Sequence, residues 1–526
     1  MAQYIHFFET GTEYNTKRSG ANYVEPWVSY TDENDKVNYN KTEYEKLLET
    51  PLTFEIISDG TIWWKNGVPD ASCQKTIEYK KNNGEWTSIT STSGSGAPEI
   101  NVTSGDTIQF RGNNTSYGYA YNGNDSRGSQ FSGSCQFKII GNIMSLINAT
   151  NFISLNTITD NYAFKRIFMQ CTGLTDAENL ILPATTLSSN CYHSMFEGCS
   201  GLTAAPVLPA MVLTNYCYYH MFSGCSSLSK TPKLPSTSLA ISCYGWMFSY
   251  CTSLTSAPEL PATTLAASCY SNMFYGCSGL TTPPKKIGNS ETVIPVSGCS
   301  AMFLGCTSLT SAPELPAESL SSYGYWGMFS GCTSLVNAPD LPVTSVSSYC
   351  CTSMFSHCSS LTKVASTLPA TTLNGATACY RQMFDSCGKL TYGPELPATT
   401  LADYCYYQMF HGCRSLTQAP ELPATALTNY CYYEMFNWCT ELTNAPDLTA
   451  PTLMRNCYYQ MFAQCEKLNS IKCLATDKSA TSCTGSWLNG VSTTGVFIKS
   501  PNIDTSTWTI GSSGIPRGWT VEDAAQ

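Results

Sequence analysis

The sequence is poor in charge. Asp, Glu, Lys and Arg make up 13% of the 526 residues, about half the usual share. Acidic residues outnumber basic ones by 38 to 28, which gives a formal net charge of −10 at pH 7. Because phosphate groups and anionic lipids are bound by basic surfaces, this balance argues against nucleic acid and against membrane surfaces as partners.

Long apolar runs are also absent from the sequence. No stretch approaches the roughly 18 apolar residues that a membrane-spanning helix needs, so we expect no membrane insertion. The first residues, MAQYIHFFETGTEYNTKRSG, contain no basic segment followed by an apolar one, so we expect no secretory signal peptide. The expectation is a chain that stays in the cytosol of the cell that makes it, unless it leaves by another route such as a virus particle.

Sequence motifs of catalysis and of metal binding are missing. There is no P-loop, no G-x-S-x-G and no H-E-x-x-H. Four of the five histidines, His193, His220, His357 and His411, fall at four different positions of the repeats described below, and no spacing pairs them with a cysteine or a carboxylate. We therefore predict no catalytic residue, no metal ligand and no cofactor. A carboxylate pair for glycoside cleavage stays open, because a solenoid can host one.

What the sequence does contain is a recurring phrase, C-Y-x-x-M-F-x-x-C. Its copies follow one another at intervals of mostly 26 residues, with a few insertions of two or three residues. With degenerate copies at Ile167-Phe168 and Trp487-Leu488 there are thirteen. Such a period is typical of a solenoid, in which each turn buries its apolar face against the next. The methionines of the phrase are Met195, Met221, Met247, Met273, Met302, Met328, Met354, Met383, Met409, Met435 and Met461.

Each repeat predicts one helix and one extended segment. In one copy, Cys405, Met409 and Cys413 lie at i, i+4 and i+8, which is one stripe of a helix. We therefore predict a short amphipathic helix with Cys, Met and Phe inward. The segment SLTQAPELP that follows holds two prolines and cannot be helical. It is predicted to be extended, with Leu416 and Leu422 inward and with its copies paired as a parallel sheet.

The 27 cysteines are unusually regular. In the repeats most of them form two columns, four residues before and four residues after the Met. On a helix these positions are about 12 Å apart, whereas a disulfide needs Cα atoms within roughly 7 Å. The C-x7-C spacing is not that of a zinc site. We predict two ladders of buried thiols that serve as small core residues, with the adjacent pair Cys350-Cys351 as the one place to check for oxidation.

An outward acidic column is the first candidate binding surface. Its members lie between the Pro and the Leu of the extended segment, so they should point away from the core. Lys233 and Lys285 interrupt the column. Stacked carboxylates repel one another unless cations or a partner neutralise them; the alternative is a solvated negative face that prevents association of edges. The column consists of Glu259, Glu314, Asp340, Glu395, Glu421 and Asp447.

An aromatic column is the second candidate binding surface. Tyr and Trp at outward positions offer flat, amphipathic area suited to sugars or to proteins. The alternative is that these rings pack between the helices of adjacent repeats. The array from 383 to 487 has no insertion and carries both columns in their most regular form. The column consists of Tyr219, Trp326, Tyr407, Tyr433 and Tyr459, with Tyr216, Tyr404 and Tyr430 on the face before it.

The chain divides into four predicted parts. Residues 1–50 are polar and aromatic, apart from a short helix over TEYEKLLE, and form an N-terminal attachment segment. Residues 51–137 contain at least five short strands with a hairpin around Gly84, which predicts an immunoglobulin-like β-sandwich. Residues 138–487 are the solenoid, and residues 488–526 are a C-terminal cap. The fold class is thus mixed: an α/β leucine-rich-repeat solenoid of about thirteen turns of 26 residues, preceded by a small β-sandwich domain.

The repeats resemble a known family. The run MFxGCxSLTxAPxLPATTL is similar to the BspA-like class of leucine-rich repeats, and the segment SWLNGVSTTGVFIKSPNIDTSTWTIGSSGIPRGWTV resembles the C-terminal cap of that group. This resemblance implies surface binding and adhesion rather than catalysis. The earlier segment EPWVSYTDENDKVNYNK resembles structural proteins of Bacteroides phages, including the crAss-like group, which implies a place in a virus particle.

Three functions are compatible with these patterns, and the first is preferred. It is a virion structural protein, a phage tail or head fibre assembled in the host cytoplasm. Residues 1–50 would bind other virion proteins and residues 138–526 a host surface glycan or protein, and a homotrimer fits such a fibre. The second is a bacterial cell-surface or secreted BspA-like adhesin, which an export signal would indicate. The third, a glycan-degrading enzyme, would need a fixed carboxylate pair and a deep pocket.

Overall fold

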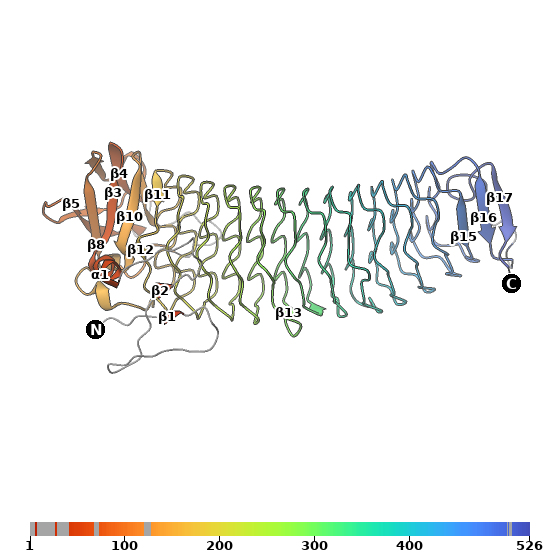
Figure 1. The fold of residues 1–526 in the computed structure, drawn as a ribbon, viewed down its shortest axis with the longest axis horizontal. Coiled ribbons are helices and arrows are strands. Elements are labelled where there is room, and N and C mark those ends of the chain that lie inside the picture. The colour runs from red at the N-terminus through yellow and green to blue at the C-terminus, as the bar shows by residue number, and fades with distance from the viewer. Residues whose placement is uncertain are drawn as a thin grey trace. The chain divides into compact units, whose positions relative to one another are not determined.

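The computed structural model describes residues 6–7, 27–28, 41–67, 73–119, 128–501, 503 and 508–525. They belong to two compact units, Met1–Ser236 and Thr237–Gln526, and each is described by itself (Figure 1). Most of the predicted attachment segment, residues 1–50, lies outside the described residues. The short helix predicted from TEYEKLLE is confirmed. The elements described in this segment are β1 (His6–Phe7), which pairs in parallel with β2 (Trp27–Val28), and α1 (Lys41–Glu49).

Besides the β1-β2 pair, the described part of the first unit contains two larger β-sheets. The larger has the order β11-β10-β3-β8-β5-β6, where β11 is Leu174–Asp176, and β12 (Leu180–Ile181) also pairs with β10. The smaller has the order β7-β4-β9. In β8 the buried residues alternate with more exposed ones, because successive side chains of a strand point to opposite faces. The antiparallel pair of β5 and β6 confirms the hairpin predicted around Gly84. The strands are β3 (Leu52–Ile56), β4 (Gly60–Asn66), β5 (Thr76–Lys81), β6 (Thr87–Thr90), β7 (Glu99–Val102), β8 (Thr107–Gly112), β9 (Ser129–Gly133) and β10 (Phe137–Asn142).

Aromatic rings from both sheets meet in the core of this domain. The ring centroid of Phe131, in the smaller sheet, lies 5.0 Å from that of Phe54 and 4.7 Å from that of Phe110, both in the larger sheet. Trp64 packs on Phe131 at 4.6 Å, and its indole N–H donates a hydrogen bond to the carbonyl of Lys75. The core therefore combines large apolar burial with a satisfied polar edge, which is how buried Trp is normally accommodated.

Strand β10 joins the larger sheet to the first repeats of the same unit. It pairs antiparallel with β3 and parallel with two short strands of the repeats. The first repeats therefore cover what would otherwise be an open sheet edge. The short elements around this junction are η2 (Gly94–Gly96), η3 (Ile143–Leu146), η4 (Phe152–Ser154), β11 (Leu174–Asp176) and β12 (Leu180–Ile181), where η denotes a 3-10 helix.

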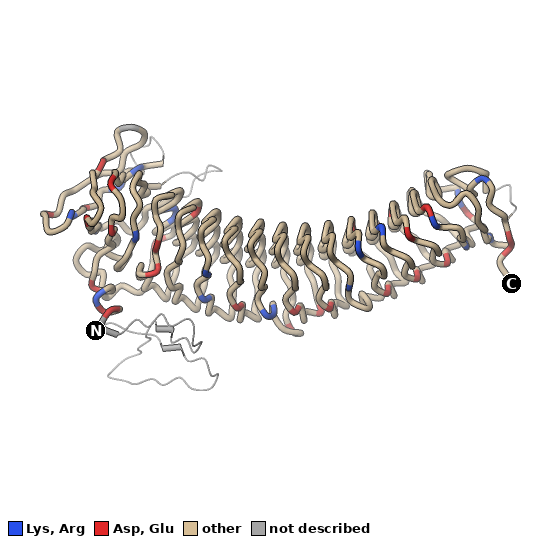
Figure 2. Tube along the Cα trace, turned by 45° about the horizontal axis from the view of Figure 1, so that its top comes forward, with Lys and Arg blue, Asp and Glu red and all other residues tan. Residues whose placement is uncertain are grey.

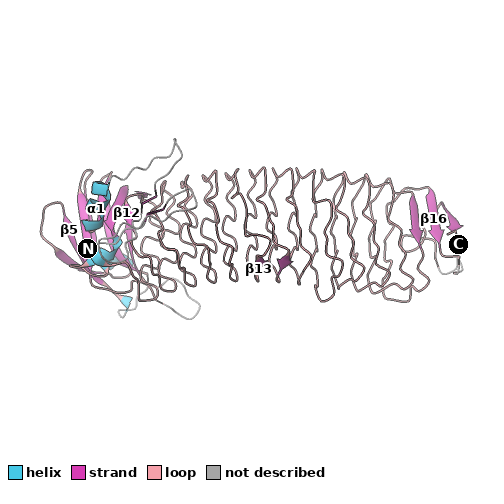
Figure 3. Cartoon of the chain, turned by 60° about the horizontal axis from the view of Figure 1, so that its bottom comes forward, coloured by secondary structure: helices cyan, strands magenta, loops and turns pink. Residues whose placement is uncertain are grey.

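Each repeat forms one turn of a solenoid, which we call a rung. The helix predicted for each repeat is absent from the described repeats (Figure 3). From its first Cys to its second Cys the chain forms consecutive β-turns, a segment we call the turn ribbon. Alternate N–H groups bond within the ribbon, as Met409 N does to Tyr406 O at 3.2 Å, or to the next rung, as Phe410 N does to Met435 O at 2.9 Å. Every fourth residue has a left-handed backbone, for example Gln408 with φ 52°.

The helix prediction is wrong because two periods lie close together. A spacing of four residues approximates the 3.6 residues per turn of a helix, but it matches the ribbon, whose conformation repeats every four residues. In an α-helix the N–H groups donate hydrogen bonds to carbonyls of the same helix. In the ribbon about half of the N–H groups donate instead to carbonyls of the next rung. The inward side chains are nevertheless those predicted, since Cys405, Met409, Phe410 and Cys413 are buried, and Tyr406 is buried with them.

The extended segments of the rungs pair less than predicted. Successive rungs meet mostly through isolated parallel bridges, such as the one between Tyr392 and Gln418. A continuous parallel sheet is therefore wrong for most of the described repeats, because the prolines have no N–H to donate to a ladder. Leu416 and Leu422 are buried, as predicted. A short regular pair is formed by β13 (Val293–Ile294) and β14 (Ser319–Leu320).

A column of stacked Phe rings runs through the core of the second unit. From Phe248 to Phe462, neighbouring rings of the column stand 5.4–5.7 Å apart with nearly parallel planes. The unit ends in a three-stranded parallel sheet, against which Trp487, Phe497 and Trp508 pack. Its strands are β15 (Ser470–Cys473), β16 (Gly495–Lys499) and β17 (Trp519–Asp523).

Candidate binding surfaces

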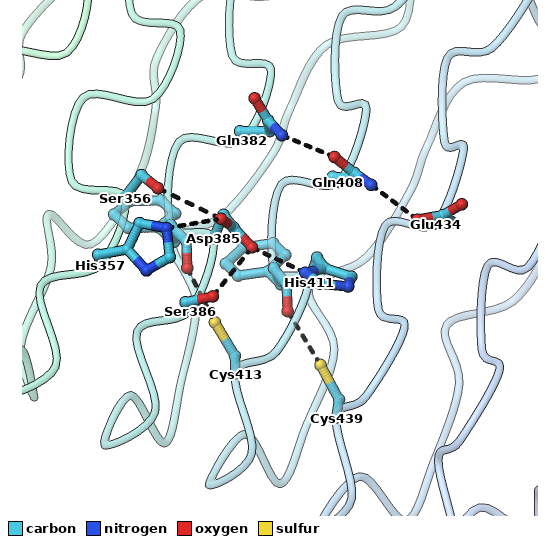
Figure 4. A network of polar contacts seen from close by, with 12 residues as sticks. Ser356, His357, Gln382, Asp385, Ser386, Gln408, His411, Cys413, Glu434 and Cys439 are labelled. Carbon is cyan, nitrogen blue, oxygen red and sulfur yellow. Dashed lines mark hydrogen bonds and ion pairs between the residues drawn. The ribbon is translucent and has the colours of Figure 1, made fainter. Parts of the chain in front are cut away.

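The second Cys of the repeats donates a hydrogen bond from one rung to the rung before it. Cys413 Sγ lies 3.1 Å from the carbonyl oxygen of Phe384 (Figure 4). The same oxygen accepts a bond from Cys387 N of its own rung, also at 3.1 Å. All 27 cysteines are buried thiols, which confirms the predicted core position of both columns. The sequence did not reveal that this Cys also ties adjacent rungs together.

These thiols are expected to be poorly reactive near neutral pH, because they stay protonated. Burial raises the pKa of Cys277 and that of Cys358 to about 12, so the reactive thiolate is scarce. At the adjacent pair, a hydrogen bond from Cys351 holds the pKa of Cys350 below its ordinary value and raises the pKa of Cys351. Both side chains are buried, and oxidation of the pair stays a prediction. Within the described ranges, no three His, Cys, Asp or Glu side chains are placed to hold a metal ion.

The acidic column lies exposed on the extended segments. Its six members are exposed, and each of them precedes a buried Leu, as the predicted outward direction requires. Figure 2 shows that Asp and Glu recur along one edge of the rungs in the second unit. Asp447 forms an ion pair with Lys472 at 2.6 Å, so part of the column's charge is compensated within the chain. Recognition of a partner by these residues stays a prediction.

The aromatic column is partly stacked. Tyr407 and Tyr433 lie 4.6 Å apart with planes 2° from parallel, and Tyr433 and Tyr459 lie 4.9 Å apart at 10°. Both faces of Tyr433 are therefore covered, and this stack offers a partner ring edges and hydroxyl groups rather than ring faces. Trp326 is 36% exposed and stacks on no ring in the described part of the chain. In the first unit, Tyr219 lies edge-on against a histidine ring. The binding role of the column stays a prediction.

A second Tyr stack lies beside the first. Tyr404 and Tyr430 are 4.6 Å apart and nearly parallel. The guanidinium group of Arg381 lies over the ring of Tyr407 at 4.7 Å, and that of Arg455 lies over Tyr430 at 5.7 Å. Such cation–π contacts hold the long Arg side chains against the rings. The face formed by the turn ribbons therefore combines Tyr, Arg and amide groups in a fixed arrangement.

A polar cluster centred on Asp385 spans three consecutive rungs (Figure 4). His411 Nδ1 lies 2.8 Å from Asp385 Oδ1, and His357 Nε2 lies 3.7 Å from Oδ2. The hydroxyl groups of Ser356 and Ser386 donate to the same carboxylate at 3.3 and 3.2 Å. The hydrogen bond to Asp385 raises the pKa of His411. The expectation that no carboxylate pairs with the histidines is therefore wrong for His357 and His411.

The sequence contained a signal for this cluster, but the signal lies in residues one repeat apart and not in a short local motif. Asp385 and His411 each follow the Phe of the phrase directly, 26 residues apart, so they occupy the same column of adjacent rungs. A neighbouring column forms a second chain, in which Gln382 donates to Gln408 and Gln408 donates to Glu434, each at 2.7 Å (Figure 4). Comparing columns rather than adjacent residues would have found both.

Two further observations concern a surface pocket and membrane insertion. One shallow pocket of the first unit is lined mainly by apolar residues, among them Tyr44, Leu180 and Val207, and its only carboxylate is Glu178. A second acid for glycoside cleavage is thus missing from that lining. In the part of the chain that the structure describes, we find no helix with the length and apolar character to span a bilayer.

Comparison with known proteins identifies the repeats. The profile of the BspA type leucine rich repeat region, with six copies, matches residues 157–296, 285–417 and 377–485. These matches cover more than half of the chain. The chain belongs to the BspA-type leucine-rich-repeat family. Every residue of the acidic and aromatic columns lies within the matched region.

Similarity to other proteins is weaker than this BspA-type match. The crystal structure of a leucine-rich repeat protein from Eubacterium ventriosum is similar at 14% sequence identity and a TM-score of 0.29, covering 68% of this chain and 90% of that one. None of the curated proteins compared with the chain matches it. The leucine-rich repeats and the solenoid are therefore assigned from the family match and the rungs themselves, and the similarity to phage structural proteins is not supported by these comparisons.

Proposed function

We propose that this chain is a recognition protein that binds a partner surface through the outward side chains of its rungs, and that it is not an enzyme. The observation that carries the proposal is the regularity of those side chains. Hydrogen bonds between rungs hold Tyr407, Tyr433 and Tyr459 in register at 4.6 to 4.9 Å. Side chains that are ordered before binding lose little conformational entropy when a partner arrives. The adhesion that the BspA-like resemblance implies supports the same role.

Two settings for this recognition are open. The resemblance of EPWVSYTDENDKVNYNK to phage structural proteins favours a tail or head fibre of a virion. There residues 1–50 would attach to other virion proteins, and residues 138–526 would bind a host surface glycan or protein. A homotrimer would fit such a fibre. The family match favours a cell-surface or secreted bacterial adhesin instead. In both settings we propose thirteen rungs as the recognition part and an immunoglobulin-like sandwich, residues 51–137, as the spacer.

Mass spectrometry of purified virus particles separates the two settings. Peptides of this chain in particles would support the fibre. If they occur only in the surface fraction of a bacterium, the adhesin setting holds and the virion assignment is wrong.

Binding of the fluorescently labelled full chain to cells tests the recognition role itself. We expect saturable binding that falls at least about ten-fold, or 1.4 kcal/mol, when one outward column is altered. One variant neutralises the acidic column with Glu395→Gln, Glu421→Gln and Asp447→Asn. The other opens the aromatic stack with Tyr407→Ser and Tyr433→Ser. Adsorption that survives deletion of residues 138–526 would contradict the proposal, and turnover of purified surface polysaccharide by the chain would contradict the non-enzymatic role.

A further inference from the structure

The first two rungs are apolar at a position that is charged in the next two. The residue before the Leu-Pro pair of the extended segment is Ile181 in the first rung and Val207 in the second. In the third and fourth rungs it is Lys233 and Glu259. Val207 is 40% exposed. Because outward charges keep such a surface from associating with others, their replacement by Ile and Val indicates a part of the surface that becomes covered.

Two more exposed apolar residues extend this patch along the second rung. Met211 and Val212, four and five residues after Val207, are 37% and 73% exposed. The preceding rung has Thr185 and Thr186 at these positions, and a parallel bridge between Thr186 and Val212 shows that the positions are equivalent. Apolar residues that are grouped on a surface mark a place where another surface docks, whereas single ones need no such explanation.

The shallow pocket of the first unit adjoins the patch, because Val207 belongs to both. The pocket lies where α1 meets the first two rungs, and its volume is about 370 Å³ with the open mouth included. Its lining carries one carboxylate, Glu178, and no cationic group. It therefore suits an apolar or aromatic side chain. The apolar and aromatic part of the lining is Tyr44 from α1, Leu180 and Ile181 from β12, and Leu182, Val207 and Pro209 from the rungs.

The chain itself supplies an aromatic segment close to this pocket. Residues 23–30, YVEPWVSY, are rich in aromatic and apolar residues, and of them only Trp27–Val28, the extended strand β2, lies in the described part. The ten residues 31–40 connect this segment to α1 and span at most about 35 Å. Tyr44, which lines the pocket, lies only one helical turn beyond Lys41, the first residue of α1. A tether of this length keeps the segment at a millimolar local concentration, so a weak apolar contact is sufficient to hold it.

We propose that residues 23–30 dock in the pocket between α1 and the first two rungs and cover the apolar patch. The tether favours this segment over a second copy of the chain, because a copy would have to bind from dilute solution. Docking buries Val207 and Val212 against aromatic residues, which is favourable in proportion to the apolar area removed from water. It also holds the N-terminal segment against the solenoid whatever partner the solenoid recognises, and it leaves residues 1–22 for attachment.

Photocrosslinking of the full chain tests where the segment lies. Benzoylphenylalanine in place of Val207 should crosslink on irradiation to residues 23–30 of the same molecule, which peptide mass spectrometry identifies. The same amino acid in place of Glu421, the equivalent position of a later rung, is the matched control and should give no crosslink to this segment. The proposal is overturned if position 207 crosslinks to a second copy, only to other parts of the chain, or to nothing.

Trypsin cleavage after Lys36 measures the same contact without a crosslinker, because a connection held at both ends is cut mainly when the segment is released. Val207→Glu, which introduces the charge of the later rungs, should raise the cleavage rate about five-fold or more, and Trp27→Ser should do the same. The double variant should be cut no faster than either, because both changes remove one contact. Glu421→Gln should leave the rate unchanged.

Additive effects of Val207→Glu and Trp27→Ser, or a cleavage rate that Val207→Glu does not change, would show that the segment and the patch do not meet. Thermal unfolding of each variant shows whether the rungs remain folded. If Val207→Glu unfolds them, Val207→Thr takes its place, because Thr has nearly the size of Val and adds only a hydroxyl group. A rate that Val207→Thr leaves unchanged would then contradict the proposal.

Discussion

At the scale of single residues, the second Cys of the repeat has a role that its spacing in the sequence does not reveal. In most repeats the second Cys fills a small buried space and donates its S–H to the Phe carbonyl of the rung before, as Cys413, Cys439 and Cys465 do. Ala would fill less of that space and donate nothing, and Ser would bring a more polar group into an apolar core. The first Cys has a weaker bond, since Cys405 Sγ lies 4.0 Å from the carbonyl oxygen of Cys431.

This difference predicts unequal effects of one substitution at the two columns. Cys413→Ala removes a buried sulfur atom and its hydrogen bond, and should lower the free energy of unfolding by about 1–3 kcal/mol. Cys405→Ala removes the same atom from an equally buried site but loses only a long contact, so it should cost less. Urea denaturation of both variants measures the shift. Equal shifts would show that the S–H···O bond contributes little.

At the scale of the element, the turn ribbon depends on residues with a left-handed backbone. Large residues such as Tyr404, Trp438 and Gln464 adopt it, with φ of 61°, 64° and 63°. Non-glycine residues rarely do so, and β-branched residues hardly ever. Rung-to-rung hydrogen bonds on both sides of each such residue hold it in place. The stack therefore imposes the conformation, and the local sequence does not choose it.

A β-branched residue at such a position should be poorly tolerated. We expect Gln464→Val to lower the free energy of unfolding by about 1–2 kcal/mol, because the branched Cβ clashes with its own backbone at φ 63°. Gln464→Gly should be close to neutral, since glycine adopts this conformation freely. Glu466→Val, at an exposed residue two positions later, controls for β-branching itself. Equal urea midpoints for the two Val variants would contradict a left-handed ribbon.

At the scale of the whole molecule, the two columns of buried thiols should make the folded state less stable at alkaline pH. Burial raises the pKa of Cys277, Cys358 and Cys405 from the ordinary 9.0 to about 12. Below about pH 9 both the folded and the unfolded chain keep these protons, and the full stability is present. Above it the unfolded chain loses them first, so stability falls as pH rises from 9 toward 12.

Thermal unfolding at a series of pH values tests this coupling. We expect a steep fall of the unfolding temperature above pH 9, with each buried thiol contributing about 1.4 kcal/mol per pH unit. Thiol reagents should label the native chain slowly at pH 8 and the urea-unfolded chain fully, because the thiolate is scarce in the fold. An unfolding temperature that is flat from pH 8 to 10 would show that the thiols are solvated.

The candidate surfaces were only partly predictable from sequence. The outward positions of Glu421 and Tyr407 follow from the spacing of their inward neighbours. The pairing of Asp385 with His411 does not, because it joins residues 26 positions apart and depends on the spacing between rungs.

The sequence by itself determined the repeat length, the inward set of Cys, Met, Phe and Leu, and the family. Those features rest on burial, which depends only on which side chains recur at which spacing. The tertiary structure alone decided between helix and turn ribbon, because a four-residue spacing fits both and only bonds to the next rung distinguish them. It also decided which outward residues touch. Contacts between rungs depend on distances of a few ångströms between side chains of adjacent rungs, and these distances cannot be read from the sequence.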